Sequence, residues 1–235
     1  MTFSNLSDGI SKKRFIEEAQ KLSPISIPIL ESTPKKSSAV LVPLIASKEF
    51  EGGLGILYCK RSTFLRRHAR EICFPGGKID PDETPIQAAI RECVEEIGID
   101  KNQVEVWTSF PELPDIFGIK GDVNNDPFNN GNIMTPTIPI IGQIKDYNPY
   151  KLKLNCKEVS EVFVKGVYDL HNPKVAKSTQ FRYSGTNGYS MPVYLTKPYP
   201  IWGMTATITF QFLSVLLRGR NRGFNHLIHY QTPFK

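Results

Sequence analysis

The sequence predicts an α+β domain built on a mixed β-sheet. Apolar segments rich in β-branched residues outnumber the segments with helical periodicity, of which two are strong and two are weaker. The 235 residues are 40% hydrophobic and 22% charged, which is typical of an ordinary globular chain with a sizeable core. We therefore expect one principal domain, with insertions rather than a second core.

The first expected elements are a short helix and two strands. Residues 10–22 indicate an amphipathic lead-in helix that starts near Asp8, and its apolar face would consist of Ile10, Ile16, Ala19 and Leu22. Two apolar, β-branched runs follow at 37–46 and 52–61. The polar, glycine-containing stretch 47–53 between them predicts a turn.

The best-defined helix is expected at residues 85–97. Thr84 is a good N-cap, Pro85 suits the first helical position, and Gly98 is a good C-terminal stop. The buried stripe would consist of Ile86, Ala89, Ile90, Cys93 and Ile97. Neighbours at i, i+3 and i+4 would crowd three carboxylates on one exposed flank, those of Glu92, Glu95 and Glu96.

The second half of the chain predicts further strands and a closing helix. The strand candidates are residues 104–110, 137–144, 160–168, 178–184 and 190–196. Residues 202–217 are apolar but are interrupted by Thr205, Thr207, Thr209, Gln211 and Ser214. This stretch falls short of the ~18 consecutive apolar residues of a membrane span, so we expect a buried core helix and no membrane partner.

The chain divides by composition into a lead-in at 1–37, a main domain at 38–217 and a basic tail at 218–235. Residues 114–132 are rich in Asn, Asp, Gly and Pro and predict a long surface loop, an insertion at about 115–132. Loops of that length are often functional, and a merely tolerated insertion is the alternative.

The charge balance favours an anionic partner. The net charge is +6 and the isoelectric point is near 9.1, which suits nucleic acid, a membrane surface or a small polyphosphate. The four cysteines fall singly, so neither a zinc site nor a disulfide framework is expected. The N-terminus resembles neither a secretory nor a transit peptide, and the final TPFK is not an S-K-L type address, so we expect an intracellular protein.

The carboxylate cluster on residues 85–97 points to a metal. The plainer interpretation is a solvated acidic face, but like charges at this spacing repel one another and only Arg91 is near enough to relieve them. Mg²⁺ or Mn²⁺ takes oxygen ligands from a few carboxylates, water and substrate phosphates. The Gly76-Gly77 turn permits close backbone approach, so the carbonyl of Gly77 is a further candidate ligand.

The spacing of these residues resembles the Nudix box, G-x5-E-x7-R-E-U-x-E-E-x-G-U. Every fixed position matches, from Gly77 and Glu83 through Arg91, Glu92, Glu95, Glu96 and Gly98, with Cys93 and Ile99 in the U places. The resemblance implies an α/β/α sandwich whose box forms a loop, helix and loop. It also implies hydrolysis of a nucleoside diphosphate linked to another group.

The resemblance also implies roles for the residues of the box. Metal ligands would be Glu92, Glu95 and Glu96, with Glu92 and Glu96 the main pair, and Arg91 would orient a glutamate through an ion pair. Glu95, or a residue outside the box, would act as general base on a metal-held water. Glu83 would be either a ligand or a hydrogen-bond acceptor beside one.

A basic stretch precedes the box and suits a phosphate-bearing substrate, because guanidinium groups bind phosphates through two hydrogen bonds. Its cationic residues are Lys60, Arg61, Arg66, Arg67, His68 and Arg70, and we expect Lys60, Arg61, Arg66 and Arg70 to bind substrate. A solvated basic loop is the alternative interpretation.

The same stretch resembles the coenzyme A diphosphatase signature, L-L-T-x-R-[SA]-x3-R-x3-G-x3-F-P-G-G. The matching residues are Leu57, Arg61, Ser62, Arg66 and Phe74-Pro75-Gly76-Gly77; Tyr58, Cys59 and Arg70 depart from it. Arg70 replaces a glycine, which restricts the backbone and adds a charge beside the phosphate site. The resemblance implies cleavage of coenzyme A or its derivatives to 3′,5′-ADP and 4′-phosphopantetheine, and a peroxisomal or mitochondrial location.

Two other functions remain open at this point. One is a Nudix pyrophosphatase for ADP-ribose, a dinucleoside polyphosphate or an oxidised nucleotide, since the box is common to all of them. The other is an inactive nucleotide- or RNA-binding module, for which the tail offers Arg218, Arg220 and Arg222. The intact carboxylates argue against nucleic acid, and oligomeric state does not follow from the sequence.

Overall fold

The computed structural model describes residues 11–23, 37–113, 136–181 and 189–217. The expected insertion at 115–132, the tail at 218–235 and most of the lead-in outside 11–23 lie beyond these ranges. The described helices are α1 (Lys12–Ala19), α2 (Pro85–Ile97), α3 (Val167–His171) and α4 (Gly203–Leu216). The described strands are β1 (Ser38–Ala46), β2 (Leu54–Arg61), β3 (Ile72–Cys73), β4 (Gly76–Lys78), β5 (Val104–Ser109), β6 (Thr137–Ile144), β7 (Val159–Gly166), β8 (Ala176–Phe181) and β9 (Tyr189–Tyr194).

The main sheet has seven strands and is mixed, as expected. Its order is β3-β2-β1-β6-β5, with β4 paired to β1 and β7 paired to β2. β1 and β6 run parallel from Ser38 opposite Thr137 to Ile45 opposite Ile144, and the other pairs are antiparallel. β8 and β9 form a separate two-stranded sheet.

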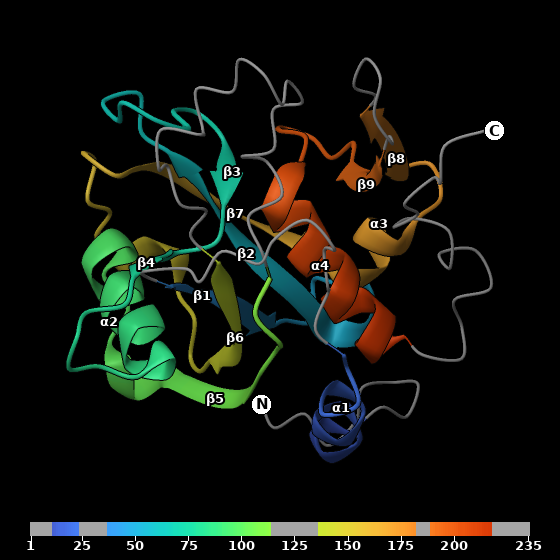
Figure 1. Cartoon of the computed structure of the whole chain (residues 1–235), viewed down its shortest axis with the longest axis horizontal. Helices are drawn as coiled ribbons and strands as arrows, with labels where there is room; N and C mark the ends of the chain where they lie inside the picture. Colours follow the sequence, from blue (N-terminus) through green and yellow to red (C-terminus); the bar gives the residue numbers. More distant parts are fainter. Residues whose placement is uncertain (1–10, 24–36, 114–135, 182–188, 218–235) are drawn as a thin grey trace, which may run out of the picture.

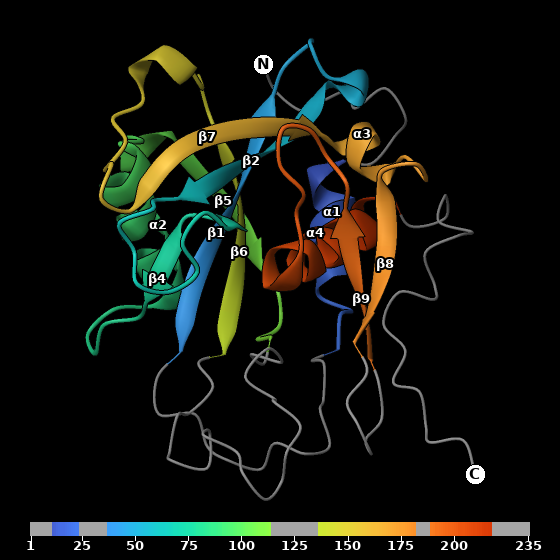
Figure 2. The same cartoon turned by 90° about the horizontal axis from the view of Figure 1, so that it is seen from above.

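Helices cover both faces of the main sheet, which confirms the α/β/α sandwich (Figures 1 and 2). Alternate residues of a strand point to opposite faces. In β1, Leu41 and Ile45 pack in the core under α2, whereas Val42 and Leu44 pack in the core shared with α1 and α4. Burying β1 on both faces makes it the central strand of the domain.

The lead-in helix is shorter than expected and has a different cap. α1 begins after Ser11, whose side-chain oxygen accepts a hydrogen bond from Arg14 N at 3.3 Å. The expected start at Asp8 and the apolar residue Ile10 lie outside the described residues. Phe15, missing from the expected face, is the main anchor, because it is buried against Trp107 and Phe212.

The closing helix α4 is buried, as its sequence predicts, and two of its buried threonines are hydrogen-bonded within the core. Thr205 Oγ1 donates to Ile72 O at 2.9 Å, and Thr209 Oγ1 donates to Thr205 O at 2.8 Å while lying 3.0 Å from the hydroxyl of Tyr58. Within the described ranges, no helix combines the length and apolarity that crossing a membrane requires.

The strand expected at 160–168 is wrong at its C-terminal end. β7 stops at Gly166, and α3 begins at Val167. Val167 and Leu170 are both buried, and a three-residue spacing places them on one face of a helix. Val167 and Tyr168, the last two residues of the expected strand, therefore belong to the first turn of α3. Of the strand expected at 178–184, residues 182–184 lie outside the described ranges.

Candidate active site

The helix α2 has the ends that the sequence predicts. Thr84 Oγ1 accepts from Gln87 N at 3.3 Å, and Gln87 Oε1 accepts from Thr84 N at 2.8 Å, which forms a capping box. At the other end, Gly98 has a φ of +71° and its N–H bonds to Val94 O. Residues of other types rarely adopt this backbone conformation. The expected helix at residues 85–97 is confirmed.

The buried face of α2 differs from the expected stripe. Ile86 is 40% exposed, whereas Ala88 is fully buried. Glu96 is only 4% exposed, so the expectation of three carboxylates on one exposed flank is wrong. The helix is turned so that Glu96 faces inwards and Glu95 faces solvent.

The turn Gly76-Gly77 is part of the main sheet and lies directly against these carboxylates. Gly76 N donates to Glu96 Oε2 at 3.3 Å. A Cβ at Gly77 would come within 2.3 Å of Glu92 Oε1, so only glycine leaves room for that carboxylate. Glu92, Glu96 and the backbone of Gly76-Gly77 therefore form one cradle of oxygen and N–H groups.

The electrostatics of the cradle favour a bound cation. Burial is the main reason why the pKa of Glu96 rises to about 8; the charges of Glu92 and Glu158 add to this rise, and the Gly76 N–H and Arg61 oppose it. Burial also raises the pKa of Glu92, against the lowering effect of Arg91. A cation would stabilise both carboxylates in their ionised form.

The donor set suits a hard divalent ion that keeps part of its shell open. Across the described ranges, no three His, Cys, Asp or Glu side chains are already gathered as a metal site. Mg²⁺ and Mn²⁺ sites commonly use one or two carboxylates and take the remaining oxygens from water or substrate phosphate. Glu92, Glu96 and the carbonyl of Gly77 fit that description.

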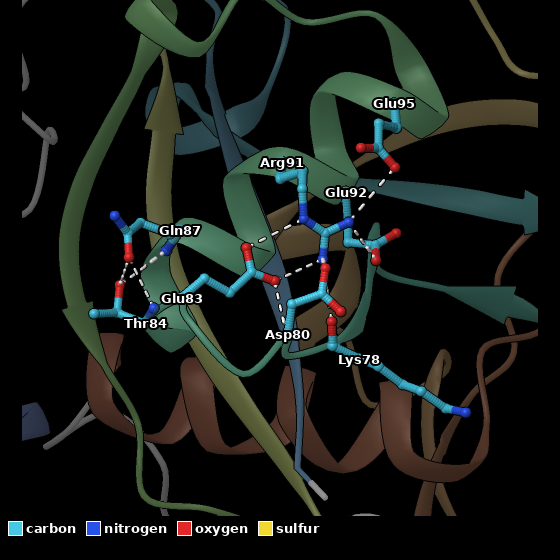
Figure 3. Close-up of polar contacts among 8 residues, drawn as sticks. All are labelled: Lys78, Asp80, Glu83, Thr84, Gln87, Arg91, Glu92 and Glu95. Atoms are coloured by element: carbon cyan, nitrogen blue, oxygen red, sulfur yellow. Dashed lines mark hydrogen bonds and ion pairs between the residues drawn. The ribbon is translucent and has the colours of Figure 1, made fainter.

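Arg91 connects the acidic groups of the box (Figure 3). Its Nε and Nη2 donate to the two carboxylate oxygens of Glu83 at 3.1 and 2.7 Å, and its Nη1 donates to Glu92 Oε1 at 3.0 Å. Nη2 also donates to Lys78 O at 3.1 Å. These contacts, above all that with Glu83, raise the pKa of Arg91 and fix Glu92 beside the glycine turn.

Glu83 and Glu95 lie further from the glycine turn. Glu83 accepts from both Arg91 and Asp80 N, and these hydrogen bonds lower its pKa. The Glu95 side chain is 55% exposed and its Oε2 lies 3.5 Å from Arg91 Nη1. Of the box glutamates, Glu92 and Glu96 thus lie together against Gly76-Gly77, and Glu83 and Glu95 lie around Arg91, as Figure 3 shows for the latter pair.

The basic stretch splits into inward and outward groups. Arg61 is close enough to lower the pKa of Glu96, and its Nε is buried without a hydrogen-bond partner in the described part of the chain. Burial and Glu96 raise the pKa of the Cys73 thiol to about 12, an effect that Arg61 opposes. Arg61 therefore lies close to Glu96.

Lys60 is directed elsewhere. Its Nζ lies 4.0 Å from the centre of the Tyr199 ring, and the Tyr199 hydroxyl donates to Glu161 Oε2 at 2.8 Å. Lys60 is thus engaged by an aromatic group beside β7, apart from Arg61. Arg66 and Arg70 are exposed in the loop between β2 and β3.

Sequence reasoning missed Glu158. Glu158 lies in the turn just before β7, and its charge raises the pKa of both Glu92 and Glu96, so it is near the cradle. Its carbonyl accepts from Ser62 N at 2.8 Å, which ties it to the basic loop. The pairing of β2 with β7 shifts register between Lys60 and Arg61, and such bulges redirect side chains near functional sites. Only the pairing of β2 with β7, which are far apart in the sequence, brings Glu158 to the candidate site.

Comparison with known proteins gives consistent results. The family model of the NUDIX domain matches residues 35–130. "Nudix hydrolase 3" of Caenorhabditis elegans is 30% identical over 224 residues, covering 88% of this chain and 85% of that protein. "Mitochondrial coenzyme A diphosphatase NUDT8" of Mus musculus is 31% identical over 216 residues, covering 91% of this chain and 93% of that protein.

A second mouse protein, "Peroxisomal coenzyme A diphosphatase NUDT7", is 33% identical over 187 residues, covering 76% of this chain and 70% of that protein. Members of this family generally use divalent metal ions and act on small nucleotide derivatives. With the complete box motif, the capped helix α2 and relatives that align along most of their length, the chain belongs to the Nudix hydrolases.

Proposed function

We propose that this Nudix hydrolase cleaves the diphosphate of coenzyme A or its acyl derivatives, releasing 3′,5′-ADP and (acyl-)4′-phosphopantetheine. The observation that carries the proposal is the junction of the acidic cradle with a basic loop, made by the Ser62 N to Glu158 O hydrogen bond. Two relatives that align with most of the chain are named coenzyme A diphosphatases, which supports this substrate class.

Glu92, Glu96 and the carbonyl of Gly77 would hold Mg²⁺ or Mn²⁺, with Glu95 as a further ligand if its side chain turns inwards. The bound ion would neutralise charge on the diphosphate and lower the pKa of a water molecule. Arg91 would position Glu92, and Glu83 would position Arg91 because both of its oxygens are engaged by that guanidinium.

Two carboxylates are candidates for the general base. Glu95, the candidate from the box, points to solvent and Arg91. Glu158 is near enough to raise the pKa of Glu92 and Glu96, and we propose that it accepts the proton from the attacking water. Its position outside the box would leave the box glutamates free to bind metal.

The cationic residues would bind the anionic substrate unequally. Arg61 lies beside Glu96 and would contact the scissile diphosphate, while Arg66 and Arg70 would contact more distant phosphate groups. Lys60 is engaged with Tyr199, so its contribution to substrate binding would be small.

The deciding experiment measures Mg²⁺- or Mn²⁺-dependent hydrolysis of coenzyme A, acetyl-coenzyme A, ADP-ribose and diadenosine tetraphosphate, with products identified by mass. We expect 3′,5′-ADP from the coenzyme A substrates at the highest kcat/KM. Glu96→Gln should lose activity, whereas Glu49→Gln, in the exposed turn after β1, should retain it. Faster hydrolysis of ADP-ribose than of coenzyme A would overturn the substrate assignment.

The names of the two mouse relatives assign those proteins to mitochondria and peroxisomes. We propose one of these compartments for this chain as well. Fluorescent fusions at either end, imaged with markers for both organelles, test this proposal.

A further inference from the structure

Arg70 occupies a backbone position that favours glycine. Its φ is +66°, and Glu71 N donates to His68 O at 3.3 Å across the turn. Arg70 is therefore the third residue of a turn in which positive φ is required, as in a type II turn, where glycine is preferred. Residues with a Cβ cost free energy in this conformation relative to glycine.

Hydrogen bonds to Arg61 on β2 hold the turn at residues 68–71 in place, so its strained backbone is fixed by its surroundings. Arg61 N donates to Glu71 O at 2.9 Å, and Arg70 N donates to Arg61 O at 3.1 Å. His68 Nδ1 lies 3.0 Å from Glu71 Oε2, and Ser62 Oγ donates to Cys156 O at 2.7 Å. His68, at φ +56°, adds a second positive-φ residue to the same turn.

The charges of this loop exceed what its own acidic groups can pair with. Glu71 is the acidic residue within it and is paired with His68. Within the described ranges, no hydrogen bond or ion pair engages the guanidinium groups of Arg66, Arg67 and Arg70, and all three are exposed. The loop therefore presents unpaired guanidinium groups on its outer side, while Arg61 faces the carboxylates within.

A metal-bound diphosphate would need few of these charges, because the cation and Arg61 would already neutralise part of its charge. The outer guanidinium groups suit an additional, separate phosphate group of about two negative charges. We propose that Arg70 forms an outer subsite for a terminal phosphomonoester of the substrate. Under the proposed function, on which this assignment of the group rests, it is the 3′-phosphate of the adenosine moiety.

The test compares ligands that differ only in that phosphate. Binding of 3′,5′-ADP and 5′-AMP is measured by calorimetry on wild type, Arg70→Gly and Arg70→Lys, with Lys48→Ala as a control for loss of one exposed positive charge. Wild type and Lys48→Ala should bind 3′,5′-ADP about 10-fold or more tightly than 5′-AMP, the effect of one charge-assisted pair. Arg70→Gly should lose that preference, and Arg70→Lys should keep part of it.

Kinetics and stability give independent readouts. Arg70→Gly should raise the KM for coenzyme A about 10-fold at nearly constant kcat, and leave 3′-dephospho-coenzyme A within twofold of wild type. The same variant should melt about 2–4 °C higher, since glycine relieves the turn. Arg70→Asn, which tolerates this backbone better than most residues, provides a second neutral variant if glycine alters the loop.

Equal losses for both ligands, or an unchanged preference in Arg70→Gly, would overturn the inference even if coenzyme A proves to be the substrate. Conversely, failure of wild type to hydrolyse coenzyme A would overturn the proposed function. The binding comparison would still decide whether Arg70 reads a terminal phosphate.

Discussion

Arg91 donates to both carboxylate oxygens of Glu83, from Nε to Oε2 at 3.1 Å and from Nη2 to Oε1 at 2.7 Å. The remaining terminal nitrogen, Nη1, donates to Glu92. A planar guanidinium can make this arrangement because its donors diverge at fixed angles. Glu83 thereby positions Arg91, and Arg91 in turn positions Glu92, a proposed metal ligand.

Arg91→Lys should fold and should weaken metal binding. A lysine ammonium keeps the charge but cannot bind Glu83 through two parallel hydrogen bonds while also reaching Glu92. The apparent affinity for Mn²⁺ should fall about 10- to 100-fold, as expected when a group supporting a ligand is lost. Metal titrations of binding and of activity check this. Arg14→Lys, on the exposed face of α1, is the matched control, and equal metal affinity in both variants would exclude the role.

Gly77→Ala should separate metal binding from folding. The added Cβ would lie 2.3 Å from Glu92 Oε1, the mobile end of a side chain, so the carboxylate should move while the backbone stays in place. We expect at least about a 10-fold loss of metal affinity with a melting temperature within about 2 °C of wild type.

The control for Gly77→Ala is Gly53→Ala. At Gly53 the φ is +74° and the nearest atom to an added Cβ lies 4.0 Å away. This variant should lose about 1 kcal/mol of folding free energy and keep its metal affinity. The reverse pattern in the two variants would contradict the proposed cradle.

Glu158→Gln should lower kcat about 100-fold or more if Glu158 is the general base. Metal affinity should change little, because the variant keeps Glu92 and Glu96. Glu161→Gln, three residues further along β7 and hydrogen-bonded to Tyr199, is the control and should stay near wild-type activity. A large loss of kcat in Glu95→Gln, with none in Glu158→Gln, would instead identify Glu95 as the general base.

Glu105→Gln should reduce stability in a pH-dependent way. Glu105 pairs with Lys12 and with Lys145, whose Nζ lies 3.1 Å from Oε2, and these contacts lower its pKa below the usual 4.5. A lowered folded-state pKa stabilises the protein above the unfolded value, and this stabilisation disappears as pH falls through the folded-state pKa.

At neutral pH the Glu105→Gln variant should therefore melt about 1–3 °C below wild type, an effect sized for a half-exposed pair. The difference should shrink as the pH falls below about 4.5 and should also shrink in high salt. Thermal melts from pH 3 to pH 7 measure it, with Glu49→Gln as the control. A difference that is independent of pH would mean that packing, and not charge, is responsible.

Local signals in the sequence predicted the ends of helix α2 well. Thr84, Pro85 and Gly98 act on their immediate neighbours, so both ends of α2 followed from residue type alone. The long apolar strands were equally accessible, since β1 and β6 read as continuous runs. The short strands β3 and β4 were missed because pairing with β2 and β1, and not local preference, makes them strands.

The sequence did not predict the rotation of α2 about its axis or the proximity of Glu158 to the cradle, because both depend on tertiary structure. A helical pattern rich in both apolar residues and carboxylates fits more than one rotation, and contact with the glycine turn selects the one that buries Glu96. Arg61 and Lys60 are adjacent in the sequence but have different neighbours, and only the pairing of β2 with β7 separates them. The box motif predicted the proposed metal ligands, and strand pairing added Glu158 to the candidate site.

The glycine turn is itself a strand of the main sheet, since β4 pairs with β1 from Val40 opposite Gly76 to Ser38 opposite Lys78. Leu41 N also bonds to Pro75 O at 2.9 Å and Ile79 N to Ser37 O at 3.1 Å. Opening of this turn would therefore break hydrogen bonds to the first residues of the central strand, so we expect its amide protons to exchange more slowly than those of an isolated loop. Movement of Gly76-Gly77 away from the carboxylates is thereby coupled to the stability of the main sheet.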